Sequence, residues 1–249
     1  MTTGMIYQPA AQRLSFERGP FRIQRSYPGR GVSDDSGLGP IGAIDHADLL
    51  PGLLVPMHEH RDDEIISYLR TGEMVHRDSA GFTKTITPTR LMVMNAGSGF
   101  SHEESIPGDT GVTMLQIFVR PRERGLEPGI QFAELSERQS TNAWRKLVGT
   151  EKSGAMTTVR SEIGLFDASL EAGSRLEIAA PDGWGWWLYV FSGEVELGDC
   201  RCSEGDSAAS PDGQTIDIAA ESKAELVLFI FDREAQHSNE GSLSGRQSL

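Results

Sequence analysis

Short segments that alternate apolar and polar residues recur along the chain, and turn-forming residues separate them. They include FRIQRSY (21–27), EIISYL (64–69) and VTMLQIFV (112–119). Alternation with a period of two is typical of strands that bury one face, and many short strands between turns are typical of a β-sandwich or barrel. The 28 glycines and 12 prolines agree with this pattern. We therefore predict an all-β fold.

The strand pattern is interrupted once. Residues 132–149, FAELSERQSTNAWRKLVG, have the spacing of a short helix, and strand-like segments resume afterwards with WGWWLYVFSG and ELVLFIFD. The last residues are small and polar, a composition typical of disorder. We predict an N-terminal barrel over residues 1–130, a helical connector over 131–149, a C-terminal barrel over 150–235 and a disordered tail over 236–249.

The two strand-rich regions also resemble each other. YLRTGEMVHRD begins at residue 68, and YVFSGEVELGD begins 121 residues later. Both segments have the form strand, Gly-Glu turn, strand, which predicts two copies of one β-domain. The identical positions are Tyr68 and Tyr189, Gly72 and Gly193, Glu73 and Glu194, and Asp78 and Asp199.

The net charge of -13 restricts the binding partners. Nucleic acids and anionic membranes attract clustered Lys and Arg, so we expect neither as a direct partner. The N-terminal sequence lacks the basic and apolar regions of a secretory signal, and no apolar run is long enough to span a membrane. Cys200 and Cys202 fit no zinc or redox motif. We expect a cytoplasmic protein, and a monomer, because two packed barrels suffice to bury their cores.

Two pairs of side chains carry candidate metal chemistry. His58 and His60 are two residues apart, and so are His102 and Glu104. On a strand, residues i and i+2 point to the same face, so neighbouring strands could bring these four donors together. Three imidazoles and one carboxylate suit Fe(II), Mn, Ni, Cu or Zn rather than Ca or Mg. The alternative is that His58 and His60 face solvent, as polar strand residues often do.

The same region resembles a known family. GLLVPMHEHRDDEIISYLRTGEMVHRDSAG (52–81) and NAGSGFSHEESIPGD (95–109) carry the patterns H-x-H-R-x-x-E, G-E-x-x-H-x-D-S-x-G and A-G-x-G-x-x-H-x-E of the pirins. Pirins belong to the cupin superfamily, so the resemblance implies two tandem cupin (jelly-roll) β-barrels joined by the connector. One departure is Pro88-Thr89-Arg90, where such barrels usually have Pro-Gly-Asp. This change affects a turn and not the candidate ligands.

The resemblance assigns the metal ligands to His58, His60, His102 and Glu104, with Glu104 also a general base. It implies one divalent transition metal, foremost Fe(II), with Mn, Co, Ni, Cu and Zn as alternatives. Three further residues are expected beside the ligands, where they would orient them: Glu64, paired with Arg61 or with a ligand imidazole, Arg61 itself and His76. Met57, Met94, Phe100 and Ile106 are expected to contribute an apolar wall, and the alternative for each of them is a place in the core.

The second copy cannot repeat this site. The 121-residue offset puts Ala179 and Pro181 at the positions of His58 and His60, and no histidine occurs between residues 103 and 236. We predict a structural role for the second barrel. Its alternating aromatics are expected to lie in the core: Trp184, Trp186, Trp187 and Tyr189.

Some pirins act as quercetin 2,3-dioxygenases, so the resemblance implies an oxidoreductase that cleaves a flavonol with O2. The substrate would then be a flavonol or another enol or phenol. The alternative is a metal-dependent redox sensor that binds transcription regulators and consumes no substrate. A third possibility is a hydrolase or isomerase that uses the same metal as a Lewis acid, since one fold can host several chemistries.

Overall fold

The computed structural model describes residues 4–29 and 35–246 of the chain. The described residues form two compact units, which we name the N-terminal and the C-terminal barrel. The N-terminal barrel comprises Leu14–Arg138, Thr157–Ser161 and the described part of Gln236–Leu249. The C-terminal barrel comprises the described part of Met1–Arg13, Gln139–Met156 and Glu162–Ala235. Each barrel therefore contains residues from beyond the boundaries that the sequence predicts.

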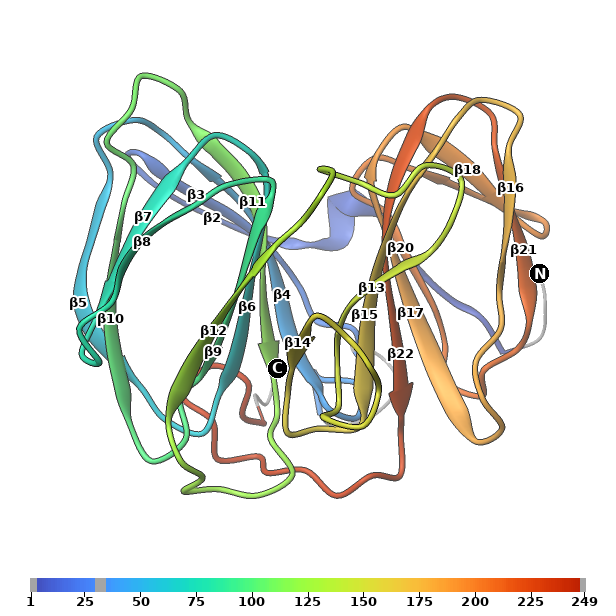
Figure 1. Cartoon of the computed structure of the whole chain (residues 1–249). Helices are drawn as coiled ribbons and strands as arrows, with labels where there is room; N and C mark the ends of the chain where they lie inside the picture. The colour runs from blue at the N-terminus through green and yellow to red at the C-terminus, as the bar shows by residue number, and fades with distance from the viewer. Residues whose placement is uncertain (1–3, 30–34, 247–249) are drawn as a thin grey trace. The chain divides into compact units, whose positions relative to one another are not determined.

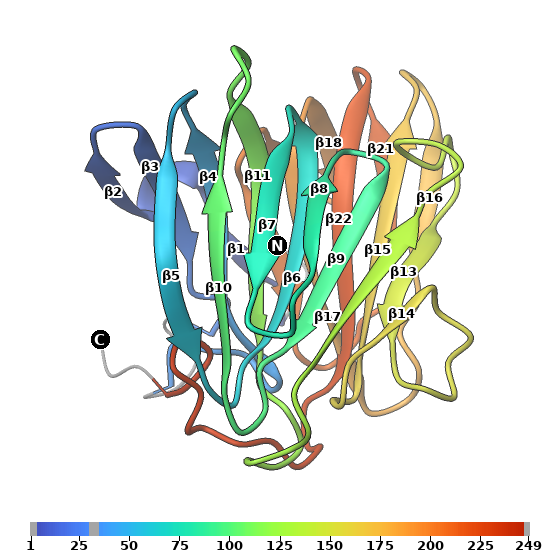
Figure 2. The ribbon, with the colours of Figure 1, turned by 60° about the vertical axis from the view of Figure 1, so that its left-hand side comes forward.

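The N-terminal barrel consists of two antiparallel sheets (Figure 1). One sheet has the order β12-β9-β6-β11-β4-β3-β2, and the other has the order β5-β10-β7-β8. Figure 2 shows the four strands of the second sheet side by side. The strands are β2 (Leu14–Arg18), β3 (Phe21–Ser26), β4 (Ile41–Leu49), β5 (Leu54–His60), β6 (Glu64–Thr71), β7 (Met74–Asp78), β8 (Thr83–Ile86), β9 (Arg90–Asn95), β10 (Phe100–Ser105), β11 (Val112–Val119) and β12 (Gly129–Glu134); the two-residue β14 (Thr157–Thr158) also belongs to this unit.

The core of the N-terminal barrel contains two groups of buried apolar side chains. One group includes Leu69, Met92 and Met114, and the other includes Ile65 and Phe118. Burying each such side chain stabilises the fold by about 1.5–3 kcal/mol. Ile65, Leu69, Met114 and Phe118 come from the predicted strand segments 64–69 and 112–119. β6 nevertheless differs from a strand that buries one face, because residues 64–69 are all buried.

The C-terminal barrel repeats this arrangement. Its larger sheet contains the order β1-β20-β17-β22-β15-β13, and its smaller sheet has the order β16-β21-β18-β19. The prediction of an all-β fold with two tandem barrels is confirmed. The elements are β1 (Ile6–Gln8), the 3-10 turn η1 (Ala10–Gln12), β13 (Arg145–Gly149), β15 (Ile163–Leu170), β16 (Arg175–Ile178), β17 (Trp184–Ser192), β18 (Glu194–Leu197), β19 (Cys200–Ser203), β20 (Ser207–Ser210), β21 (Ile216–Ala220) and β22 (Ala224–Asp232).

The Gly-Glu turns of the internal repeat occupy the same place in both barrels. Gly72 lies between β6 and β7 with φ of 75°, and Gly193 lies between β17 and β18 with φ of 82°. A Cβ atom at Gly72 would lie 2.3 Å from the carbonyl oxygen of Gly111, and one at Gly193 would lie 2.2 Å from that of Lys223. Only glycine fits a positive φ and so close an approach of backbone. The repeat in the sequence therefore reflects a repeated turn.

The predicted helical connector is wrong. The described residues contain no α-helix, and residues 129–134 instead form β12, which pairs with β9. Phe132 lies opposite Met92 and Ala133 opposite Leu91, so β9 satisfies the backbone groups that a helix would satisfy internally. Residues 145–149 form β13. The local sequence has helical spacing, but residues 129–134 form a strand because they can pair with β9.

The tail also differs from its prediction as far as the structure describes it, to residue 246. The carboxylate of Asp63 accepts hydrogen bonds from the Ser242 hydroxyl at 2.7 Å and from the backbone N–H of Ser244 at 2.8 Å. The guanidinium of Arg120, which is fully buried, donates to the Ser244 carbonyl at 2.7 Å. The Asp63 carboxylate and the Arg120 guanidinium thus order small polar residues that composition alone predicts to be disordered. Residues 247–249 lie outside the described part.

No helix among the described residues is both long enough and apolar enough to cross a bilayer.

Replacing Asp63 by asparagine is expected to free the tail. The change removes a charge that the tail's N–H and O–H groups share, at a cost of about 2 kcal/mol. Hydrogen exchange at the amides of Leu243 and Ser244 should accelerate in Asp63→Asn. The control is Asp109→Asn, which alters an exposed loop aspartate. Equal exchange rates in both variants would contradict the anchoring role of Asp63.

Candidate metal centre

The site is built on the pairing of β5 with β10. The two strands are antiparallel, with His102 opposite His58 and Phe100 opposite His60. The register shifts by one residue between His102 and Glu104, so that β5 contains a bulge around Pro56. Proline suits a bulge because it has no N–H to leave unpaired in the ladder. The pairing places the two histidines of β5 beside the histidine of β10.

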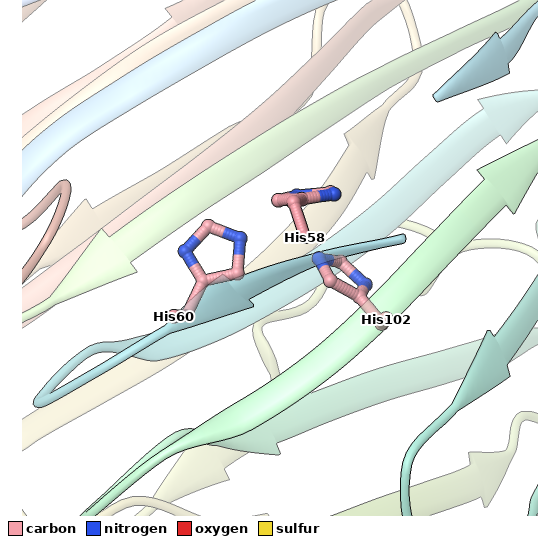
Figure 3. A group of neighbouring side chains, drawn as sticks. All are labelled: His58, His60 and His102. Atoms are coloured by element: carbon pink, nitrogen blue, oxygen red, sulfur yellow. The ribbon is translucent and has the colours of Figure 1, made fainter. Parts of the chain in front are cut away.

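The three imidazoles converge on one point. The ring centroids of His58 and His60 are 4.8 Å apart, those of His58 and His102 4.5 Å, and those of His60 and His102 5.1 Å. One nitrogen of each ring lies within 4.8 Å of the others, close enough to share a metal ion. Figure 3 shows the rings gathered on the same side of the two strands. The alternative in which His58 and His60 face bulk solvent does not hold, since His60 is buried and His58 is half-buried.

Glu104 lies next to this group and is almost fully buried. Its Oε1 is 3.6 Å from Nδ1 of His102, and it forms a second group with His102 and His76 in which the donor atoms are also within 4.8 Å. Gln116 on β11 lines a cavity together with Glu104 and lowers the pKa of this carboxyl through its side-chain amide. The structure therefore brings together all four residues of the predicted ligand set, as two groups that share His102.

Hydrogen bonds fix which ring nitrogens are available. Nδ1 of His58 lies 2.9 Å from the carbonyl oxygen of Pro56. A carbonyl can only accept, so Nδ1 of His58 carries the proton and Nε2 keeps a free lone pair.

His102 is oriented through a chain of two further residues. Nε2 of His76 is 2.9 Å from the carboxylate of Asp78 and donates to it, which leaves Nδ1 of His76 as an acceptor. Nδ1 of His102, at 3.4 Å, then donates to Nδ1 of His76. The lone pair of His102 is thereby on Nε2. His76, predicted to lie beside the ligands, is fully buried and lies beside His102.

The electrostatics of the site favour neutral imidazoles. Burial, together with the neighbouring rings, lowers the pKa of His102 to about 2. Burial also lowers the pKa of His58, and it lowers that of His76 against the opposing effect of Asp78. Burial raises the pKa of Glu104 to about 7, and the hydrogen bond with Gln116 opposes this rise only in part. Neutral rings with free lone pairs are the form that binds metals.

Three buried polar atoms at the site have no hydrogen-bond partner among the described residues: Nδ1 of His60, Nε2 of His102 and Oε1 of Glu104. The residues of the last two atoms, His102 and Glu104, also share a donor group. Such atoms cost free energy unless something satisfies them, and these two are electron-pair donors. A cation bound among the imidazoles would satisfy Nε2 of His102, and Oε1 of Glu104 is a further donor beside the same ring. The residues present thus fit a metal ion.

The site opens into a cavity of about 720 Å³ in the N-terminal barrel. His58, His60 and Glu104 line the cavity, together with Gln116. The guanidinium of Arg25 forms two 2.5 Å hydrogen bonds with the carboxylate of Asp45 at its wall. The apolar part of the wall consists of Phe16, Phe21, Ile23, Val55, Phe118 and Leu243.

The apolar wall differs from the expected one. Met94, Phe100 and Ile106 lie in the core, as the alternative predicts, and Met57 is exposed. All four residues are near the ligands in sequence, which does not determine what lines a cavity. Apart from Val55 on β5, the apolar wall comes from β2, β3, β11 and the tail, which the fold brings to the site from a distance.

Two of the residues expected around the ligands are engaged elsewhere. Glu64 accepts hydrogen bonds from the Arg160 side chain and the Asn95 amide, both at 2.9 Å, rather than from Arg61 or a ligand imidazole. Arg61 pairs with exposed Glu59 at 3.0 Å. Glu59 and Arg61 alternate with the histidines along the chain, and both are exposed. Their place on the opposite face explains why they cannot orient the ligands.

Three supporting residues were not identified from the sequence. Asp63 lies 3.5 Å from Nδ1 of His60, Asp78 forms a hydrogen bond with His76, and Gln116 lowers the pKa of Glu104. Asp63 and Asp78 lie within the motif segments, but nothing in the sequence indicates that their side chains are buried. Gln116 is a polar residue within the otherwise apolar segment VTMLQIFV, and that contrast was a usable signal.

The comparisons with known proteins agree with this geometry. Residues 33–119 match the family Pirin, and residues 147–230 match the family described as Quercetinase C-terminal cupin domain. The chain belongs to the pirin family. Its fold is therefore a pair of cupin barrels.

Individual relatives support the same family. The chain is 28% identical to a quercetin 2,3-dioxygenase of Escherichia coli over 175 residues, which is 69% of this chain and 74% of the relative. It is 31% identical to human pirin over 153 residues, which is 57% of this chain and 52% of that protein.

Solved structures match over most of the chain. YhhW from Escherichia coli superposes with a TM-score of 0.82 at 22% identity, covering 91% of this chain and 97% of YhhW. The bacterial pirin YhhW in complex with nickel(II) superposes with a TM-score of 0.80, also at 22% identity, covering 91% of this chain and 98% of that one. At this identity the match shows the fold.

Replacing His76 by phenylalanine is expected to weaken divalent metal binding by about 10- to 100-fold, the usual effect of removing a group that orients a ligand. Phenylalanine keeps the ring but cannot fix the tautomer of His102. The control is Arg77→Ala, which changes the exposed neighbour on the same strand. Nickel titration with a competing chelator measures the affinity. An unchanged affinity in His76→Phe would show that the chain from Asp78 to His102 plays no part.

Proposed function

We propose that this chain is a metal-dependent dioxygenase that cleaves a flavonol such as quercetin. The observation that carries the proposal is the group of three imidazoles and one buried carboxylate at the wall of a 720 Å³ cavity. Ligand pockets of small molecules typically occupy about 300–1,000 Å³. Relatives named quercetin 2,3-dioxygenase support the substrate class.

His58, His60, His102 and Glu104 would hold the metal. A mixed set of nitrogen and oxygen donors suits a first-row transition metal. Fe(II) remains our first expectation, and the nickel complex of the related YhhW supports nickel as an alternative. When bound, the metal would supply a positive site for the enolate oxygen of the substrate and for O2. The overall reaction converts one flavonol and one O2 into one depside and one carbon monoxide, so that all atoms balance.

The residues of the chain itself would bind and orient the substrate. Phe16, Phe21 and Phe118 provide flat apolar contacts for the aromatic rings, and they keep water away from them. Arg25 lies 5.7 Å above the ring of Phe118 and is held there by Asp45, so it can donate to a phenolic oxygen without moving. Leu243 makes the tail part of the same wall.

Glu104 would accept the proton of the substrate hydroxyl. Its carboxylate lies in the cavity wall beside His102, and the carboxylate oxygen that does not bind the metal would be the acceptor. A general base needs a proton within hydrogen-bond reach, and general acid–base catalysis contributes about 10²- to 10⁴-fold. This role adds to that of ligand.

Glu104→Gln is expected to lower O2 uptake with quercetin by about 10²- to 10⁴-fold, since it removes both a ligand charge and the base. The matched control is Glu59→Gln on the paired strand. Glu59 lies between His58 and His60 but faces away, so the activity of this variant should stay within about twofold of the unmodified protein, as for most surface changes. An oxygen electrode measures uptake after anaerobic loading with Fe(II), Mn(II), Co(II), Ni(II) or Cu(II).

His102→Ala is measured in the same assay, with metal content determined for every sample. Turnover that needs both the metal and His102 would support the dioxygenase. Stoichiometric metal without turnover would reject quercetin as the substrate and favour the sensor alternative. No bound metal in any sample would reject the ligand assignment itself.

Metal binding is also expected to stabilise the fold. A ligand that binds only the folded state at 100 times its Kd contributes about 2.7 kcal/mol. Urea unfolding with and without Ni(II) should show this difference in the unmodified protein, and His58→Ala should reduce it strongly. An unfolding midpoint that does not respond to Ni(II) would contradict binding at this site.

A further inference from the structure

The C-terminal barrel has a cavity of its own, of about 440 Å³. Ala179 and Pro181, the counterparts of His58 and His60, line it. They follow β16, which pairs with β21 as β5 pairs with β10. The predicted loss of the metal ligands therefore leaves open space rather than a filled core.

The register of the larger sheets confirms that the two cavities correspond. In the N-terminal barrel, Phe118 and Gln116 pair with Ile65 and Ser67 and line the cavity. In the C-terminal barrel, Ile230 and Leu228 pair with Trp186 and Leu188, which lie 121 residues after Ile65 and Ser67. Ile230 and Leu228 also line the second cavity. The group that contacts the buried carboxylate, Gln116, is thus replaced by leucine.

The wall of the second cavity is aromatic. It includes Trp144, Phe166 and Trp184, whereas Trp186 and Trp187 are fully buried in the core. Trp184 therefore departs from the predicted core role. The indole N–H of Trp144 donates to the Glu177 carbonyl at 2.9 Å, which fixes the orientation of this ring. Flat, oriented aromatic side chains are suited to planar ligands.

One positive charge lies at this wall. The ammonium of Lys146 is 5.6 Å from the ring centroid of Phe166 and 3.4 Å from the Ser153 carbonyl oxygen. No described carboxylate forms an ion pair with Lys146 within 4.0 Å. The wall contains one carboxylate residue, Glu177, which is exposed. An ammonium ion can make three hydrogen bonds, so Lys146 keeps donors for an anion.

We propose that the C-terminal barrel is a metal-free binding site for a planar aromatic molecule with one carboxylate. The rings would lie among Trp144, Phe166 and Trp184, and the carboxylate would accept hydrogen bonds from Lys146. The volume lies within the range of about 300–1,000 Å³ that is typical of ligand pockets. This site is separate from the metal centre and does not depend on flavonol cleavage.

Isothermal titration calorimetry of the metal-loaded full chain with 2-naphthoate tests the site. One equivalent should bind. Ala179→Trp fills the second cavity and should abolish binding there, while Val55→Trp fills the first cavity and should leave it intact. Circular dichroism checks that both variants fold. Absence of saturable binding to the unmodified protein would overturn the proposal, and so would binding that Val55→Trp abolishes and Ala179→Trp preserves.

The charge is tested with 2-naphthamide, which has the same shape and no charge. The unmodified protein should bind 2-naphthoate roughly tenfold more tightly, the size of one charge-assisted hydrogen bond. Lys146→Met should remove this preference, and Lys152→Met, at an exposed lysine in the turn after β13, should keep it. Equal affinities for the two probes in the unmodified protein would overturn the role of Lys146. The comparison of 2-naphthoate with 2-naphthamide needs no cavity-filling variant.

Discussion

The antiparallel register of β5 against β10 is the constraint on which the site depends. It sets His58 opposite His102, and the i, i+2 spacing on β10 puts Glu104 on the same face as His102. A slip of one residue would turn the histidines of β5 to the other face, where Glu59 and Arg61 now lie. His102 and Glu104 would then no longer lie beside the imidazoles of β5, and the four residues could not bind one cation.

The sequence predicted what depends on strand periodicity and missed what depends on long-range pairing. The i, i+2 spacing of His58, His60, His102 and Glu104 was enough to place them together, because a strand has only two faces. The partners of Glu64 were not predictable, since Arg160 is 96 positions away along the chain. The helical spacing of residues 132–149 misled for the same reason: β9, far away in sequence, decides the conformation of β12.

The two barrels show how one scaffold can hold two different cavities. Both have a short four-stranded sheet, a Gly-Glu turn with positive φ and inward side chains at corresponding register positions. In one barrel those positions carry imidazoles and an amide, and in the other they carry alanine, proline and aliphatic groups. The strands determine the direction in which each side chain points. The side chains at a few positions then determine whether the interior suits a cation or an aromatic ring.

The ends of the chain are exchanged between the two barrels. β1, near the start of the chain, pairs with β20 of the C-terminal barrel, while the described part of the tail packs on Asp63 and Arg120 of the N-terminal barrel. Cutting the gene at the midpoint would therefore give each half the wrong end: the first half would keep an orphan strand and lose the cover beside His60. A single cupin barrel produced on its own would need its terminal segment transplanted from the opposite end of the gene.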